Sequence, residues 1–159
     1  MVGQIKNNKI NRILIYLVFI LVVIWLLVVL GIKIMATKDK KTVALVGQEV
    51  EVVLAKTPEQ KSLGLGRLDV LAPNTGMLFV YDNYIIPSFW MKDMRFSIDI
   101  IWIKNDTVIG YEKSVKPQTS NDNLPTYQPK SFINYVLEVN SGFVDKYGLL
   151  IGDEVKIDI

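Results

Sequence analysis

The sequence predicts a mainly β protein: an antiparallel β-sandwich or barrel-like domain with two short helices, preceded by one N-terminal transmembrane helix. Three observations support this fold class. One uncharged apolar segment lies near the N-terminus, several short β-branched runs separated by turn residues come after it, and two connections carry helix-capping patterns. We expect a tail at residues 1–12, a transmembrane helix at 13–32, a linker at 33–41 and a β-rich domain at 42–159.

The apolar segment is long enough to cross a bilayer. Residues 13–32 are 20 residues without a charge, between Arg12 and Lys33. A helix rises about 1.5 Å per residue, so this length matches the roughly 30 Å of the hydrocarbon core. A cleaved signal peptide is the alternative, but its apolar core usually has roughly 7 to 15 residues, and no small-x-small cleavage pattern comes after it here. We therefore predict an uncleaved anchor.

Both flanks of this segment are basic, so the positive-inside rule separates the two orientations poorly. Three basic residues precede the segment and four come after it, namely Lys6, Lys9 and Arg12, then Lys33, Lys38, Lys40 and Lys41. The 12-residue tail is short enough for its charges to count in full, and a single N-terminal anchor commonly exports the domain on its C-terminal side. We therefore predict a single-pass membrane protein with its C-terminal domain outside the cytoplasm.

The charges divide the chain in the same way. Residues 1–40 hold six Lys or Arg and one acidic residue, which leaves 12 basic and 15 acidic residues in 41–159, a net charge of −3. A mildly acidic domain lacks the electrostatic footprint of nucleic-acid binding, so no nucleic-acid partner is expected. The basic flanks suit anionic lipid headgroups, and the lipid bilayer is the expected partner of residues 13–32.

The chain contains no Cys and no His. Their absence excludes disulfides, thiolate nucleophiles, Ser-His-Asp triads, imidazole bases and the usual zinc sites. Carboxylate, amine, phenol and hydroxyl chemistry remains. The sequence assigns no catalytic residue, metal or cofactor, and a non-catalytic protein is favoured over an enzyme.

Strand patterns dominate residues 42–159. Each expected strand combines β-branched or aromatic residues with flanking turn residues, and Asn105-Asp106 joins two of them as a hairpin. The expected strands are Glu49–Ala55, Gly76–Tyr81, Ser88–Met91, Ser97–Lys104, Thr107–Val115, Ile133–Asn140 and Glu154–Ile159. About seven or eight strands at this spacing predict two antiparallel sheets packed face to face.

Two short helices interrupt the strands. Thr57–Gln60 combines a capping box with Pro at the first helical position, so a helix begins there and ends near Gly64 or Gly66. A second helix is expected from about 141 to 147, ending at Gly148, because glycine often comes after the last turn of a helix.

Strand alternation places three charged side chains among apolar or aromatic neighbours. Lys92, Asp99 and Glu138 come from different expected strands, and Arg67 comes from the connection after the first helix. A buried charge without a partner is costly, so these four residues are expected to form one polar cluster or to bind a ligand. Three roles stay open for the cluster: a structural ion-pair network, a polar ligand pocket and an acid–base site.

Six short motifs occur in order along the chain, namely Gly64-x-Gly66-Arg67, Gly76–Val80, Phe89–Met94, Asp99–Ile101, Val136–Asn140 and Gly152-Asp153-x-Val155. Together they resemble the prokaryotic family known as domain of unknown function 192, over about residues 49–158. The resemblance implies a compact β-rich domain, often preceded by an export signal or a membrane anchor, and no established activity.

The polar hallmarks of that family fall on Arg67, Lys92, Asp99 and Glu138, which implies that these residues form one cluster. The sequence departs from the family at one point. The family usually continues Trp-Met-Lys with Asn-Thr, where this chain has Asp93-Met94. If the amide and hydroxyl bind a ligand in the family, the added charge changes that role here.

These observations favour a membrane-anchored extracytoplasmic binding or accessory module without catalysis, for an envelope polysaccharide, peptide or protein. One alternative is a carbohydrate-active enzyme that uses Asp99 and Glu138 as a carboxylate pair, which requires roughly 5 to 9 Å between the two carboxyls, or Lys92 with a Tyr as base. The other alternative is a structural scaffold that the charged cluster only stabilises.

Overall fold

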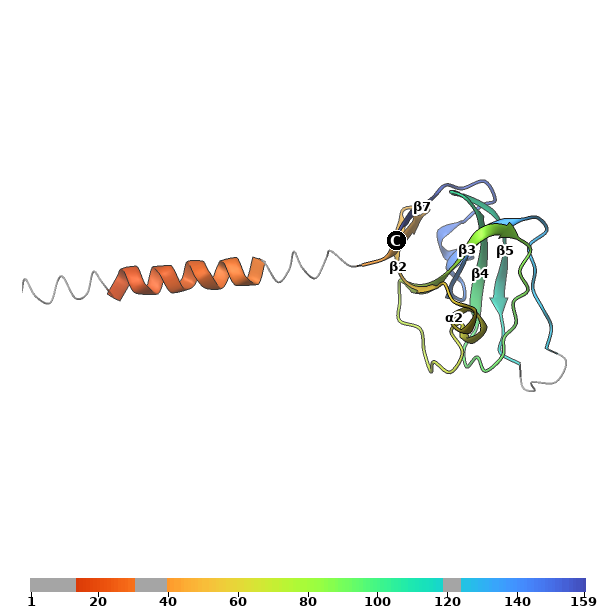
Figure 1. The fold of residues 1–159 in the computed structure, drawn as a ribbon, viewed down its shortest axis with the longest axis horizontal. Helices are drawn as coiled ribbons and strands as arrows, with labels where there is room; N and C mark the ends of the chain where they lie inside the picture. The colour runs from red at the N-terminus through yellow and green to blue at the C-terminus, as the bar shows by residue number, and fades with distance from the viewer. Residues whose placement is uncertain (1–13, 31–39, 119–123) are drawn as a thin grey trace, which may run out of the picture. The chain divides into compact units, whose positions relative to one another are not determined.

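The computed structural model describes residues 14–30, 40–118 and 124–159 (Figure 1). The chain forms two compact units, Met1–Lys40 and Lys41–Ile159. The predicted tail at 1–12 and residues 33–39 of the predicted linker lie outside the described residues.

In the first unit, residues 14–30 form an α-helix. They lie within the predicted transmembrane segment 13–32, whose end residues 13, 31 and 32 lie outside the described residues. None of the helices in the described ranges combines the length and the apolar character that crossing a membrane requires. The transmembrane helix therefore stays a prediction from the sequence.

The second unit is mainly β, as predicted. Its described residues contain seven strands and two short helices, in the chain order β1 (Thr42–Leu45), β2 (Gln48–Ala55), α2 (Pro58–Leu63), β3 (Thr75–Ile85), β4 (Ile98–Lys104), β5 (Thr107–Val115), β6 (Ile133–Asn140), α3 (Phe143–Tyr147) and β7 (Val155–Asp158). The capping box of the first expected helix is confirmed, since Thr57 Oγ1 accepts from Gln60 N and Gln60 Oε1 accepts from Thr57 N.

The seven strands of the described residues form one sheet in the order β5-β4-β6-β3-β2-β1-β7. Neighbouring strands are antiparallel except β2 and β3, which are parallel. The sheet curls into a half-barrel whose edge strands meet at one end, where Val108 N donates to Asp153 O at 2.9 Å and Val155 N donates to Asp106 O at 2.7 Å.

The expected sandwich of two antiparallel sheets is therefore wrong, and the barrel-like alternative is closer to the observed fold. The physical reason lies in the connection between β2 and β3. A parallel pair requires a long crossover instead of a tight turn, and residues 56–74, which include α2, provide that crossover (Figure 1).

Six of the seven expected strands are confirmed, and β3 extends four residues beyond its expected end. Ser88–Met91 is not a strand, because only Phe89 pairs, in an isolated bridge with Tyr127. The short strand β1 is an addition to the expected elements. It forms a hairpin with β2 through Val46 and Gly47, both of which have a positive φ.

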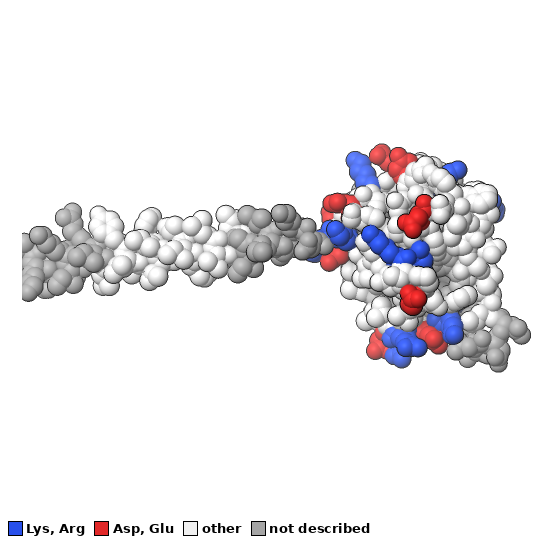
Figure 2. Space-filling model, in the orientation of Figure 1, with Lys and Arg blue, Asp and Glu red and all other residues white. Residues whose placement is uncertain are grey.

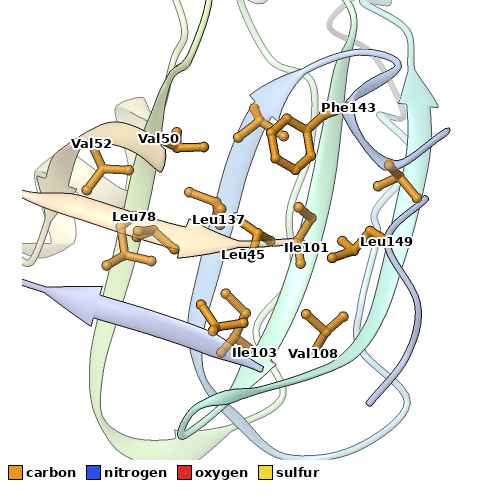
Figure 3. Packing of buried hydrophobic residues seen from close by; sticks show 14 residues of the cluster. Leu45, Val50, Val52, Leu78, Ile101, Ile103, Val108, Leu137, Phe143 and Leu149 are labelled. Atoms are coloured by element: carbon orange, nitrogen blue, oxygen red, sulfur yellow. The ribbon is translucent and has the colours of Figure 1, made fainter. Parts of the chain in front are cut away.

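Apolar side chains cover both faces of the sheet. Figure 3 shows one cluster, in which side chains from β1 to β6 converge with Phe143 of α3. In β4, Ile101 and Ile103 belong to this cluster, whereas Ile100 and Trp102 belong to a second one. Because successive strand residues point to opposite faces, the two clusters lie on opposite sides of the sheet. Two charged side chains of the central strands, Asp99 of β4 and Glu138 of β6, are buried between these layers and the sheet.

Candidate functional site

Glu138 is a buried carboxyl on the face of the second apolar cluster. Only 4% of the residue is exposed. In the sheet it lies between Met77 of β3 and Ile100 of β4, its register partners. Its Oε2 atom has no hydrogen-bond partner among the described residues. Burial raises the pKa of Glu138 to about 8, so the carboxyl is mainly protonated at neutral pH.

A cavity of about 180 Å³ lies beside the Glu138 carboxyl. Half of its other lining residues are aromatic or basic and come from α2, β3 and the segment after β3, namely Lys61, Phe79, Tyr81, Phe89, Trp90 and Lys92. The Lys61 ammonium lies 4.2 Å from the centroid of the Tyr81 ring, within the range of a cation–π interaction. The cavity therefore combines one buried acid, a phenol and two ammonium groups.

The Tyr81 phenol is held in its neutral form. Burial is the larger cause and the negative charge of an ionised Glu138 the smaller one, and together they raise the pKa of Tyr81 to about 12. Tyr81 is half-buried, so part of its ring remains accessible from the cavity mouth. At neutral pH the phenol can donate a hydrogen bond, but it does not act as a ready base.

Two glycines shape the connection after α2. Gly64 has a φ of +54°, and a Cβ built on it would lie 3.8 Å from Glu138 Oε2, so the backbone passes next to the buried carboxyl. A Cβ on Gly66 would lie 2.8 Å from Leu63 O and 3.3 Å from Lys92 O. Only glycine allows the connection to pass this close to the backbone at Lys92.

A backbone hydrogen bond joins the same connection to the segment after β3. Arg67 N donates to Asp93 O at 3.0 Å, and both residues are in the left-handed region, with φ of 69° and 57°. Asp and Asn adopt this conformation more readily than most other residues. The change from the usual Asn of the related family to Asp93 therefore keeps the backbone conformation that this hydrogen bond needs.

A second, more open cavity of about 490 Å³ adjoins the first. Arg67, Lys92, Asp93 and Glu59 lie in its lining, and Lys92 lines both cavities. The predicted cluster is thus present in part. Glu138 and Lys92 share the first cavity, and Lys92 and Arg67 share the second.

Asp99 does not belong to this cluster, so the prediction is wrong for this residue. Asp99 pairs in register with Val139, whereas Ile100 pairs with Glu138. Residues one position apart in register point to opposite faces of the sheet. The two carboxyls therefore lie on opposite sides, and the predicted carboxylate pair is not formed.

Asp99 has a structural role instead. It is fully buried, its Oδ1 accepts from Ser114 N at 2.8 Å and from Gly142 N at 3.2 Å, and its Oδ2 accepts from Val144 N at 2.9 Å. Gly142 is the N-cap of α3 and has no side chain to cap the helix. Asp99 provides that cap from a neighbouring strand.

Sequence reasoning missed Tyr81 and Lys61 as site residues. Tyr81 could have been found, because it lies two residues after Phe79 in β3 and therefore points to the same face. Lys61 lies on a one-and-a-half-turn helix, where no pattern distinguishes it from any other surface lysine. Within the described ranges, no group of three or more acidic side chains is arranged to hold a metal ion.

Comparison with known proteins identifies relatives without an assigned activity. The model of the family DUF192, described as "Uncharacterized ACR", matches residues 39–157. None of the curated proteins matches the chain. A solved structure of a candidate transcription regulator from Sinorhizobium meliloti 1021 is 27% identical, with a TM-score of 0.68, and the match covers 75% of this chain and 94% of that one.

A second solved structure, of a protein of unknown function from Novosphingobium aromaticivorans DSM 12444, is 24% identical with a TM-score of 0.66. The match covers 72% of this chain and 83% of that one. At this identity the likeness supports the fold alone. Both comparisons agree with the curled β domain described above.

Asp99→Asn should lower the free energy of unfolding by about 3 kcal/mol, because the amide cannot replace a carboxylate that accepts three backbone N–H groups. Urea unfolding of the purified chain measures this change. Asp106→Asn, at an exposed position in the β4–β5 turn, is the matched control and should change stability by less than about 0.5 kcal/mol. Equal effects of the two substitutions would contradict the capping role of Asp99.

Glu138 should make stability depend on pH. Its pKa is about 8 in the folded protein against an ordinary 4.5, so between these values the folded state binds one more proton than the unfolded state. The contribution of this extra proton to the free energy of unfolding is fully present below about pH 4.5 and is lost as the pH rises through 8. The free energy of unfolding falls by about 1.4 kcal/mol per pH unit within that window.

Glu138→Gln removes this titration. The free energy of unfolding of both proteins is measured in urea at several pH values. The difference between them, variant minus wild type, should increase from pH 5 to pH 8, because only the wild type loses stability through this titration. Parallel curves for the two proteins over this range would show that Glu138 is ionised in the folded state.

Proposed function

This chain belongs to the family DUF192, and we propose that it is a membrane-anchored extracytoplasmic binding module without catalysis, whose cavity beside Glu138 takes a saccharide of the cell envelope. The observation that carries the proposal is that Glu138 lines a cavity while its buried Oε2 atom lacks a hydrogen-bond partner among the described residues. An unpartnered buried polar atom costs roughly 1 to 3 kcal/mol. A ligand group that bonds to it offsets this cost when the ligand binds.

The state of the carboxyl favours a hydroxyl-bearing ligand. A protonated carboxyl donates one hydrogen bond and accepts others, and a sugar hydroxyl has the same two capacities. Lys61 and Lys92 line the same cavity and would repel a ligand ammonium group. Trp90, 43% exposed, and the ring of Tyr81 provide aromatic surface on which the apolar face of a sugar ring can pack.

The arrangement gives less support to catalysis. Hydrolysis of a glycoside by two carboxylates needs both groups to face one substrate, and Asp99 lies across the sheet from Glu138. The alternative of a Lys92 and tyrosine base is also disfavoured, because the raised pKa of Tyr81 keeps its phenol protonated. A binding role needs neither group to transfer a proton.

The anchoring part of the proposal rests on residues 13–32, which carry no charge, and on the basic residues at both ends of this segment. A role in transcription regulation through nucleic-acid binding has less support here, although the S. meliloti protein is named as a candidate transcription regulator. Residues 41–159 have a net charge of −3, and Figure 2 shows basic and acidic side chains interspersed on one face of this unit.

Glu138→Met should separate binding from scaffolding. Calorimetry of the purified full chain in detergent, with a panel of neutral, N-acetylated and acidic hexoses and their disaccharides, should detect binding to the wild type and an affinity loss of about ten-fold or more in the variant. Thermal stability should stay equal or rise, because methionine removes an unpartnered polar atom without a large change in volume.

Two outcomes would contradict the proposal. If no sugar of the panel binds the wild type, the saccharide function is wrong. If Glu138→Met binds as the wild type does but melts at a clearly lower temperature, Glu138 is a structural residue and the scaffold alternative is favoured.

The predicted orientation has its own test. A reporter enzyme that is active only in the cytoplasm, fused after Ile159, should be inactive in cells that express the full chain. The same reporter fused directly after Met1 is the control and should be active. Activity of the C-terminal fusion would contradict the extracytoplasmic location.

A further inference from the structure

The two cavities of the site form one continuous binding surface. Ser62, Leu63 and Lys92 line both of them, so a ligand that reaches Glu138 in the first cavity can extend past Lys92 to Arg67 in the second. The second cavity has more than twice the volume of the first, about 490 against 180 Å³. The two ends of this surface differ in chemistry: one holds the buried acid Glu138, and the other holds two exposed cations, Arg67 and Lys92, together with the acidic residues Glu59 and Asp93.

The cations of the second cavity are available to a ligand. Within the part of the chain that the structure describes, the ion pairs join Arg95 to Asp69 and Lys113 to Asp145, and neither Arg67 nor Lys92 takes part in one. Two acidic residues, Glu59 and Asp93, lie in the same lining. Hydrogen bonds from its own backbone N–H and from Thr57 lower the pKa of Glu59, and Asp93 has an interaction partner, whereas Arg67 and Lys92 are in no ion pair among the described residues.

The backbone at these two residues is held in place. The Arg67 N–H to Asp93 O hydrogen bond joins the segment of Arg67 to that of Lys92, and the close approach of Gly66 to Lys92 O leaves no room for either segment to shift toward the other. Because both backbone segments are fixed, only the exposed side chains of Arg67 and Lys92 have to be ordered when they bind a ligand.

On the basis of the proposed function, we propose that the saccharide is acidic: its hydroxyls bind to Glu138 in the first cavity, and a carboxylate or phosphate substituent binds to Arg67 and Lys92 in the second. A guanidinium matches either anion with two parallel hydrogen bonds, and an ammonium adds a second positive charge. The neutral state of Glu138 suits this ligand, because an ionised carboxylate at the same site would repel the anion.

The test compares sugars that share a ring and differ in one substituent. Glucose, glucuronate and glucose 6-phosphate, with N-acetylglucosamine and its 6-phosphate, are titrated into the full chain in detergent at low salt. The acidic sugars should bind about ten-fold or more tightly than their neutral counterparts, and this preference should fall as salt is added. If glucuronate binds more tightly than the sugar phosphates, the substituent of the ligand is a carboxylate. If the sugar phosphates bind more tightly, it is a phosphate.

Three variants assign the preference to residues. Arg67→Gln should reduce the preference for acidic sugars to about three-fold or less, and Arg67→Gln with Lys92→Gln should abolish the preference. Lys156→Gln removes an exposed cation of β7 that lines neither cavity, and should keep the preference. Melting temperatures of all variants show that each one is folded.

The outcomes that overturn the two proposals differ. If neutral and acidic sugars bind with equal affinity, or if Lys156→Gln reduces the preference as much as Arg67→Gln does, the acidic specificity is wrong and the saccharide function stands. If none of the sugars binds, both proposals are overturned.

Discussion

The desolvation of Glu138 is the constraint on which the site depends. Among the described residues of this domain, two carboxyls are buried, at positions one residue apart in register, and their environments are opposite. Asp99 accepts three backbone hydrogen bonds and caps α3, as a structural carboxylate does. Glu138 lines a cavity, and its buried Oε2 atom lacks a hydrogen-bond partner among the described residues. Since Asp99 illustrates how this fold satisfies a buried acid, the different environment of Glu138 supports a role in binding.

The local features of the fold could be predicted from the sequence, because local interactions determine them. The Thr57 capping box, the Asn105-Asp106 hairpin and the bounds of β5 and β6 depend on side-chain chemistry within a few residues. The parallel pairing of β2 and β3 could not be predicted from the sequence. Polar and apolar residues alternate in the same way in a strand that pairs with a parallel neighbour as in one that pairs with an antiparallel neighbour. A single curled sheet instead of a sandwich is the consequence.

The sequence predicted most of the residues of the candidate site, but not how these residues lie relative to one another. Alternation within each strand indicated correctly that Asp99 and Glu138 are buried, but their common face depends on the register between β4 and β6, which a difference of one residue reverses. Arg67 and Lys92 came together through contacts of the backbone, at Gly66 and at Asp93, that no side-chain pattern reports. Asp93 has a positive φ, a conformation that Asp and Asn adopt more readily than most other residues.

The most direct test of this account is the titration of the Glu138 carboxyl itself. In protein labelled with ¹³C at the glutamate side-chain carboxyl, with Glu138→Gln to assign the signal, NMR reports the protonation of this group as the pH changes. The account predicts a midpoint near 8, because the carboxyl is buried without a partner. A midpoint near the ordinary value of 4.5 would show that water or a cation reaches the carboxyl in the free protein, and would contradict the account.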